Sequence, residues 1–438
     1  MPKILSPIDP QDARQLWASL AEEGKAPTEL KFAGQVLPTY SVGIGPWIDR
    51  IAETYLRDLS RRHAHFKLVI APYGGGKTHF LMSVGSRALD EGFGVAYVAC
   101  TRGVSLDSPL DVYRAFMKTL QLPEDDRPGA NRFLHRILEH KMRQIQEAGA
   151  PDPEAAFALW LAQVSADDYP ENAFGRVMAE ALRAQHNPAQ ASAGDAALRW
   201  LQGDTGTLTK EDLAALRLAK VPARAQGVLG QNLLLSVIRF AKEQAGVQGV
   251  VILFDEVETL FNATGKALQR VLSAMRVMID LPAGISGGIP LLGVFSAVPD
   301  VLEQLTRYVA LEQRLAVRGA TFEERNDFAV QIHLDRVGSQ EDLLRALGSR
   351  LIDVGQTATG HGFDRSVQVP NVENLARVAA QRSLQVDARR LFVKTCVNIL
   401  HLQASEGERV LSEEELASRY AGFFNSLKEL EQTAEAEP

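Results

Sequence analysis

The residues best suited to chemistry form a glycine-rich turn that ends in Gly-Lys-Thr. Residues 66–72 have the apolar composition of a buried strand, and an apolar helical pattern follows Thr78. Three consecutive glycines let backbone N–H groups converge on phosphate oxygens, and the positive end of the next helix faces the same anion. The pattern predicts a phosphate-binding loop, in which Lys77 reaches the β- and γ-phosphates and Thr78 binds Mg²⁺. An ordinary surface loop is the alternative.

The whole turn and the residue after it are expected to line a nucleotide site. These residues are Tyr73, Gly74, Gly75, Gly76, Lys77, Thr78 and His79. The usual phosphate-loop pattern begins with a further glycine, where this chain has Ala71. Because that position opens the turn and need not touch phosphate, we interpret the departure as small.

A second motif lies far downstream, where a continuous apolar run from Val250 to Phe254 ends in Asp255 and Glu256. Such a run is typical of a central parallel strand buried on both faces. We expect Asp255 to hold Mg²⁺ beside the phosphate loop, and Glu256 to orient and polarise the attacking water. Alternation along an extended chain would point Glu258 the same way as Glu256, so Glu258 is the next candidate. A solvated acidic strand end is the alternative.

A third apolar strand is predicted over residues 290–296 and ends on Ser296. There the hydroxyl could bond the attacking water or the γ-phosphate, although a plain strand-end serine fits equally well. Further along, residues 386–392 open a helix with Arg389 and Arg390 in its first turn. The helix dipole favours cations at the opposite end, so this placement indicates an anionic ligand.

Composition indicates one large α/β domain with a smaller one. The chain has 438 residues, 46% hydrophobic and 23% charged, with two cysteines and a net charge of −7. The separated cysteines favour a reducing cytoplasm over a metal cluster, and no secretory signal opens the chain. The net charge excludes a whole-molecule attraction for nucleic acid, but a basic helix over residues 132–143 leaves a local contact open. A solvated surface is the alternative there.

The order of phosphate-loop strand, acidic strand, polar strand and helical lid resembles the AAA+ class, especially its initiator and clamp-loader branch. The resemblance implies a P-loop core with a parallel sheet flanked by helices. Residues 387–389 are similar to the small-residue-then-arginine pattern of that branch, which implies that Arg389 senses the γ-phosphate. AAA+ proteins usually borrow another arginine from a neighbouring subunit, and Arg307 and Arg314, on the helix after the Ser296 strand, are the candidates, with Arg318 behind them. A surface ion pair is the alternative for each.

Three segments resemble the ATP-binding proteins of bacteriophage-exclusion (BREX) defence systems: residues 73–81, 198–203 and 253–258. The resemblance implies the ATPase component of an anti-phage system that acts on DNA or DNA-bound partners with other defence proteins. The two motifs predict ATP and Mg²⁺ as cofactors, and the borrowed arginine of AAA+ proteins implies a homo-oligomer with shared sites. The alternative is a nucleotide-gated switch that assembles and recruits an effector without motor activity on DNA. A small-molecule kinase fits less well, because no acceptor-binding pattern accompanies the loop.

The expected organisation has four parts. Residues 1–65 lead into the nucleotide pocket, with the turn at 42–46 against the base and a helix over 47–56. Residues 66–335 form the ATPase core, with a large helical insertion at about 123–230. Residues 336–404 form the helical lid, and residues 405–438 form a C-terminal helix and acidic tail.

Overall fold

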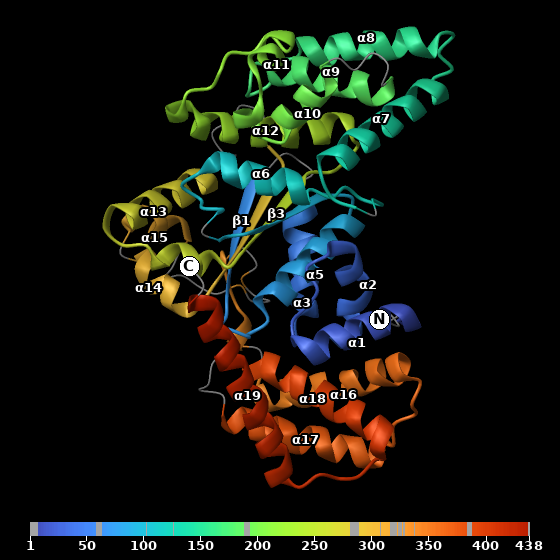
Figure 1. The fold of residues 1–438 in the computed structure, drawn as a ribbon, viewed down its shortest axis with the longest axis vertical. Helices are drawn as coiled ribbons and strands as arrows, with labels where there is room; N and C mark the ends of the chain where they lie inside the picture. Colours follow the sequence, from blue (N-terminus) through green and yellow to red (C-terminus); the bar gives the residue numbers. More distant parts are fainter. Residues whose placement is uncertain are drawn as a thin grey trace.

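A five-stranded parallel sheet forms the centre of the computed structural model (Figure 1). The structure describes residues 8–57, 64–101, 103–125, 127–187, 193–280, 289–306, 308–315, 322, 326, 329–336, 338–382 and 388–436. The strands are β1 (Ala64–Ile70), β2 (Gly94–Ala99), β3 (Val250–Asp255), β4 (Leu291–Ala297) and β5 (Gln331–His333). They lie in the order β2-β3-β4-β1-β5, and every neighbouring pair is parallel. The strands predicted from the sequence are therefore confirmed.

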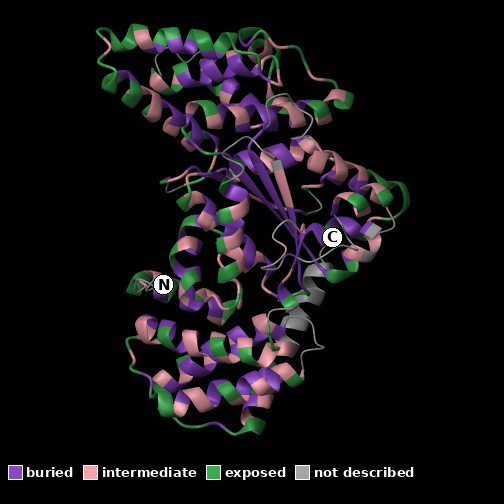
Figure 2. Cartoon of the chain, turned by 180° about the vertical axis from the view of Figure 1, so that it is seen from behind, coloured by how far each residue is buried: buried purple, intermediate pink, exposed green. Residues whose placement is uncertain are grey.

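Both faces of the sheet are covered, which explains the unbroken apolar runs. Successive residues of a strand point to opposite faces. In β3, Ile252 and Phe254 belong to one hydrophobic cluster with the helices above the sheet, whereas Val251 and Leu253 belong to a second cluster with the N-terminal and lid helices. The strands appear as buried ribbons between helices with exposed outer faces (Figure 2).

Core helices flank the sheet on both sides. They are α5 (Lys77–Asp90), α6 (Pro109–Thr119), α12 (Gln226–Gln244), α13 (Gly265–Asp280), α14 (Pro299–Thr306) and α15 (Val309–Leu315). Two short helices, not the single one expected, follow the Ser296 strand in the described residues, and Arg314 lies on α15.

The predicted helical insertion forms a separate layer above the sheet (Figure 1). Its α-helices are α7 (Ala130–Glu147), α8 (Pro153–Ala166), α9 (Phe174–His186), α10 (Gly194–Leu201) and α11 (Lys210–Ala215). Trp160, Phe174 and Trp200 are buried among them. Trp160 donates to Gln244 and Phe174 packs edge-on against Phe240, both on α12, so the core of the insertion is continuous with that helix.

The lid lies at the opposite end of the molecule and combines both ends of the chain (Figure 1). Helices α16 (Gln340–Thr359), α17 (Arg365–Gln381), α18 (Ala388–Glu406) and α19 (Glu413–Ala436) follow one another in sequence. Helix α1 (Pro10–Glu22) packs on α16 and α18, and α2 (Leu30–Tyr40) packs on α5 and α16. The N-terminal helices thus connect the lid to the core.

The predicted helix before β1 is present in two parts. Helix α3 (Gly45–Ile51) continues into a π-helical turn, Ala52–Leu56. At the other end of the chain, Ser412 and Glu415 cap α19 reciprocally, with hydrogen bonds of 2.9 and 3.2 Å between the amide of each and the side chain of the other. Among the described helices, none combines the length and apolar character that a membrane span requires.

Candidate nucleotide-binding site

The phosphate-loop turn connects β1 to α5, which begins at Lys77. Gly76 has φ +91°, a left-handed conformation that side chains rarely adopt. A Cβ on Gly75 would lie 2.7 Å from the Ala71 Cβ and 2.8 Å from the Pro72 oxygen. The missing side chain at Gly75 therefore makes room for Ala71, which explains how this chain accommodates alanine where the usual loop has glycine.

The Asp255 carboxylate joins the phosphate loop to the acidic strand. Thr78 Oγ1 donates to Asp255 Oδ2 at 2.6 Å, and Tyr97 Oη donates to the same oxygen at 3.0 Å. Ser296 Oγ and the Glu256 amide donate to Asp255 Oδ1. Asp255 is only 1% exposed. These donors fix the carboxylate beside Thr78, as the two separate sequence motifs predict.

Ser296 supports Asp255 instead of facing the cavity. Its side chain is fully buried, and its hydroxyl donates to the Asp255 carboxylate. It does not belong to the residues that line the cavity. The expectation that Ser296 bonds the attacking water or the γ-phosphate is therefore not supported by this geometry, because the hydroxyl proton is used to position Asp255.

The two glutamates after β3 take different positions. The strand ends at Asp255, and Glu256 adopts φ +55°, so the alternation of an extended chain does not continue to Glu258. Glu256 is exposed toward the cavity, and its pKa is raised by desolvation and then by the charges of Asp255 and Glu258. Glu258 is buried, and its Oε1 lies 3.3 Å from Lys77 Nζ.

The lid contributes an arginine from the first turn of α18, as the sequence predicts. Arg389 Nη1 donates to the Gly75 oxygen at 2.8 Å, and Nη2 donates to the Leu334 oxygen at 3.1 Å. Burial lowers the pKa of this guanidinium. Asp387, the first residue of the lid pattern, lies outside the described residues. Arg389 therefore reaches the phosphate loop from the lid and lines the same cavity.

His79 connects the phosphate loop to the N-terminal segment. Its Nε2 lies 2.6 Å from Ser41 Oγ, and its ring packs edge-on against Tyr40. Burial, followed by the positive charge of Arg389, lowers the pKa of His79 to about 4, so the ring is neutral at pH 7. The neighbouring residues Val42 and Ile44 line the cavity.

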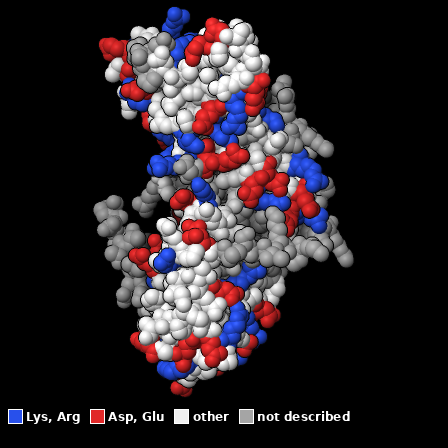
Figure 3. All heavy atoms as spheres, turned by 90° about the vertical axis from the view of Figure 1, so that its right-hand side faces the viewer, with Lys and Arg blue, Asp and Glu red and all other residues white. Residues whose placement is uncertain are grey.

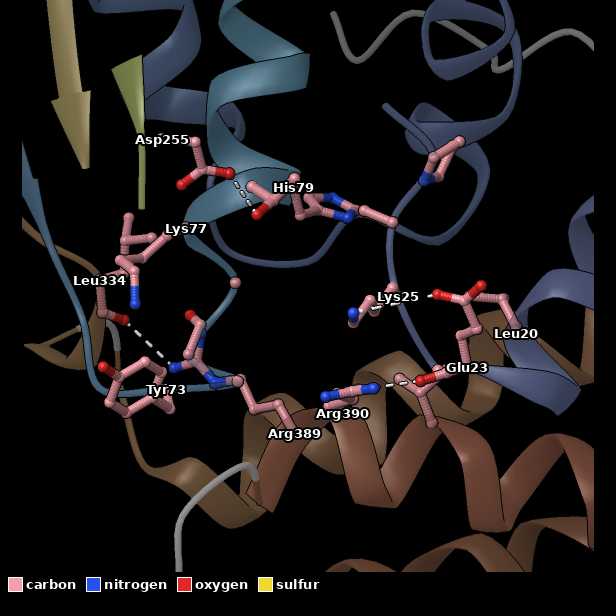
Figure 4. A pocket seen from close by; sticks show the side chains of 18 of the residues that line it. Leu20, Glu23, Lys25, Tyr73, Lys77, His79, Asp255, Leu334, Arg389 and Arg390 are labelled. Atoms are coloured by element: carbon pink, nitrogen blue, oxygen red, sulfur yellow. Dashed lines mark hydrogen bonds and ion pairs between the residues drawn. The ribbon is translucent and has the colours of Figure 1, made fainter. Parts of the chain in front are cut away.

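The phosphate loop, the acids Asp255, Glu256 and Glu258, and Arg389 line one cavity of about 760 Å³, a volume suited to a nucleotide. Figure 4 shows Lys77, Arg389 and Tyr73 on one side and Lys25 on the other. The Tyr73 ring centroid is 5.0 Å from Lys77 Nζ. The wall that holds Lys25 follows α1 and has no recognisable motif, so sequence reasoning missed it.

Two oxygen donors at this site suit a magnesium ion. Thr78 Oγ1 and Asp255 Oδ2 are adjacent, and Mg²⁺ prefers one or two protein oxygens together with substrate phosphates. Within the described part of the chain, His, Cys, Asp and Glu residues do not gather in threes around a common point. The arrangement fits a cation that takes its remaining ligands from a nucleotide and water.

Arg314 lies away from this cavity. Its guanidinium makes two hydrogen bonds with Asp280, of 2.6 and 2.7 Å, and a third with the Ala310 oxygen at 2.7 Å. It does not line the cavity of its own subunit. Arg307 and Arg318 lie outside the described residues. The acid paired with Arg314 is on α13, which the sequence pattern did not indicate.

The strand order and the loop after β1 define an α/β P-loop fold with a helical insertion and a C-terminal helical lid. A family model for the BREX system ATP-binding proteins BrxC/D matches residues 9–415, and the chain belongs to this family. It is therefore an ATP-binding protein, as its resemblance to the family implies.

The solved structures to which the chain is similar include that of the Aeropyrum pernix ORC2 protein in ADPNP–ADP complexes. The two share 10% sequence identity with a TM-score of 0.44, over 86% of this chain and 67% of that one. The family assignment does not depend on this similarity. A search of curated proteins finds no match.

Proposed function

We propose that this protein hydrolyses ATP to ADP and phosphate with Mg²⁺ as cofactor, in the cavity between the phosphate loop and the lid. The supporting observation is the 2.6 Å hydrogen bond from Thr78 to Asp255. It joins two motifs that are 177 residues apart in the chain. A hydroxyl and a carboxylate in contact at the end of a phosphate loop would hold a Mg²⁺ ion, which would neutralise phosphate charge.

In this proposal the protein contributes positioning and charge more than covalent chemistry. Backbone N–H groups of residues 74–78 and the Lys77 ammonium hold the phosphates. Thr78 and Asp255 would hold Mg²⁺, which would supply neutralising charge to the phosphates. Glu256 polarises the attacking water, and its raised pKa suits a group that accepts a proton.

Additional positive charge comes from arginines. Arg389 reaches the phosphate loop from the lid and is proposed to contact the γ-phosphate. Arg314 is proposed to act in a neighbouring subunit's site, because it lies outside its own cavity. An arginine supplied in this way is worth about 10³ to 10⁵ in rate for related nucleotidases. The active form would then be a homo-oligomer with shared sites, in the cytoplasm.

Two substitutions test the assignment of catalysis. Glu256→Gln should retain ATP binding and nearly abolish turnover, because the amide cannot accept the proton from water. Lys77→Ala should weaken ATP binding itself. Binding is measured by calorimetry and turnover by phosphate release. Wild-type turnover in Glu256→Gln would contradict the catalytic role of this residue.

Within a BREX system, the proposed activity is ATP-driven work on double-stranded DNA or on a DNA-bound partner. The alternative is a nucleotide-gated switch that assembles and recruits another defence protein. One observation favours the switch. On the basic helix α7, Arg132 and Arg136 pair with Asp125 and Glu124.

The charges on one face of the molecule agree with this observation, because basic and acidic side chains are intermingled there (Figure 3). The two functions differ in their response to DNA. A motor should show an ATPase rate stimulated by double-stranded DNA, with affinity falling steeply as salt rises. A switch should show ATP-dependent assembly, measured as particle mass, with no response to DNA.

A further inference from the structure

Glu258 holds the phosphate-loop lysine in a buried ion pair. The Glu258 and Lys77 side chains are 5% and 8% exposed, and their charged atoms are 3.3 Å apart. The other acceptors of the Lys77 ammonium are main-chain oxygens of Ala71 and Pro72, at 3.4 and 3.5 Å. Among the described residues, Glu258 is thus the charged partner of the lysine expected to bind phosphate.

The second carboxylate oxygen of Glu258 is unusual. Oε2 is buried and has no hydrogen-bond partner among the described residues. A buried carboxylate with one unsatisfied oxygen depends strongly on its cationic partner, because desolvated charge is costly without compensation. Loss of the Lys77 contact would therefore leave Glu258 as a buried charge without a cationic partner, which costs free energy.

We infer that Glu258 is a positioning residue that competes with nucleotide phosphate for the Lys77 ammonium and so lowers the affinity for nucleotide. The inference rests on the proposed placement of the phosphates at Lys77. A phosphate there also brings negative charge toward a buried carboxylate that already lies close in sequence to Asp255 and Glu256. Both effects act against binding.

The place of Glu258 in the fold separates this role from water activation. Both glutamates line the cavity, but Glu258 lies in a 3₁₀ turn, Val257–Asn262, and is 6% exposed, whereas Glu256 is exposed. A carboxylate engaged with Lys77 is poorly placed to take a proton from water. Glu258 therefore acts through Lys77, and its removal should change nucleotide affinity before it changes the chemical step.

The experiment compares Glu258→Gln with the wild-type protein in two assays. ATP and ADP dissociation constants are measured by calorimetry, and the thermal midpoint is measured without nucleotide. We expect both nucleotides to bind about tenfold more tightly, which corresponds to about 1.4 kcal/mol. We also expect a lower midpoint without nucleotide, because the ion pair is lost. Glu211→Gln, on the exposed surface of α11, is the charge-matched control and should change neither value.

A purely structural role would give the opposite pattern, with a lower midpoint and weaker binding. Equal or weaker nucleotide binding in Glu258→Gln would overturn the inference. A double-mutant cycle with Lys77→Met adds a second test, because competition through the lysine requires the gain in affinity to shrink when Lys77 is absent. An undiminished gain would also overturn it. Failure of ATP hydrolysis in the wild-type protein would be a separate result, since these readouts measure binding.

Discussion

Arg389 offers a direct test of how the lid completes the site. Its guanidinium makes two hydrogen bonds from the lid helix α18 to the core, to the oxygens of Gly75 at 2.8 Å and Leu334 at 3.1 Å. One of these carbonyls belongs to the phosphate loop itself. Replacing Arg389 by alanine therefore removes both a lid-to-core connection and a cation that lines the cavity.

The size of the effect follows from these contacts. A hydrogen bond that involves a charged group contributes about 1.5–3 kcal/mol, so losing two of them weakens closure of the lid by about 3 kcal/mol or more. Each 1.36 kcal/mol corresponds to about tenfold in rate, which gives a fall of at least ~10²-fold in kcat/KM if catalysis requires the closed lid. Loss of the positive charge in the transition state would increase this fall.

The assay is steady-state phosphate release by Arg389→Ala, Arg389→Lys and a control. Lysine retains the charge but lacks the planar fork that reaches two carbonyls, so it should give an intermediate rate. Arg365→Ala removes an exposed lid arginine paired with Asp353 and should leave the rate unchanged. A rate for Arg389→Ala within twofold of wild type would refute the reasoning, because the lid would then act without this residue.

Three further outcomes are expected. Lys25→Ala should weaken ATP binding about fivefold, because the Lys25 amine faces the cavity and its ion pair with Glu23 is long and exposed. Lys31→Ala, at an exposed position, is the control and should have no effect. Calorimetry measures the affinities, and equal values for Lys25→Ala and wild type would exclude Lys25 from the nucleotide site. Arg314→Ala should lower turnover about 10³-fold in an assembled sample without changing ATP binding; unchanged phosphate release would remove Arg314 from the site. Partial burial raises the pKa of Glu408, but hydrogen bonds from Gln368, His361 and the Asp364 amide bring it below its ordinary value. The folded-state pKa is therefore depressed, so Glu408→Gln should lower the free energy of unfolding by about 1–3 kcal/mol at pH 7. This difference from wild type should disappear as the pH falls below about 4.5, where the carboxylate becomes protonated. Urea unfolding measures it, and a difference that does not change with pH would contradict the prediction.

The sequence predicted the parts of the site that lie on regular strands. Apolar runs ending in Asp255 and Ser296 required strands buried on both faces, and the structure places these strand ends together. The contribution of Arg389 followed from a cation in a first helical turn. In each case a local pattern indicated its own position.

The remaining features depend on contacts that no local pattern records. Lys25 reaches the cavity because α1 packs on the lid, and Gly24 fits against the Arg390 oxygen with φ +65°. Glu256 and Glu258 take different positions because Glu256 itself adopts a left-handed conformation at the end of β3. An extended chain would have pointed both side chains the same way. The ion pair between Arg314 and Asp280 joins two helices that are distant in sequence.

The most direct test of the nucleotide site is an experimental structure of Glu256→Gln with ATP and Mg²⁺. The account predicts the phosphates on the backbone N–H groups of residues 74–78, with the metal between Thr78 and Asp255. A nucleotide bound elsewhere, or a metal that contacts neither of these residues, would contradict the account.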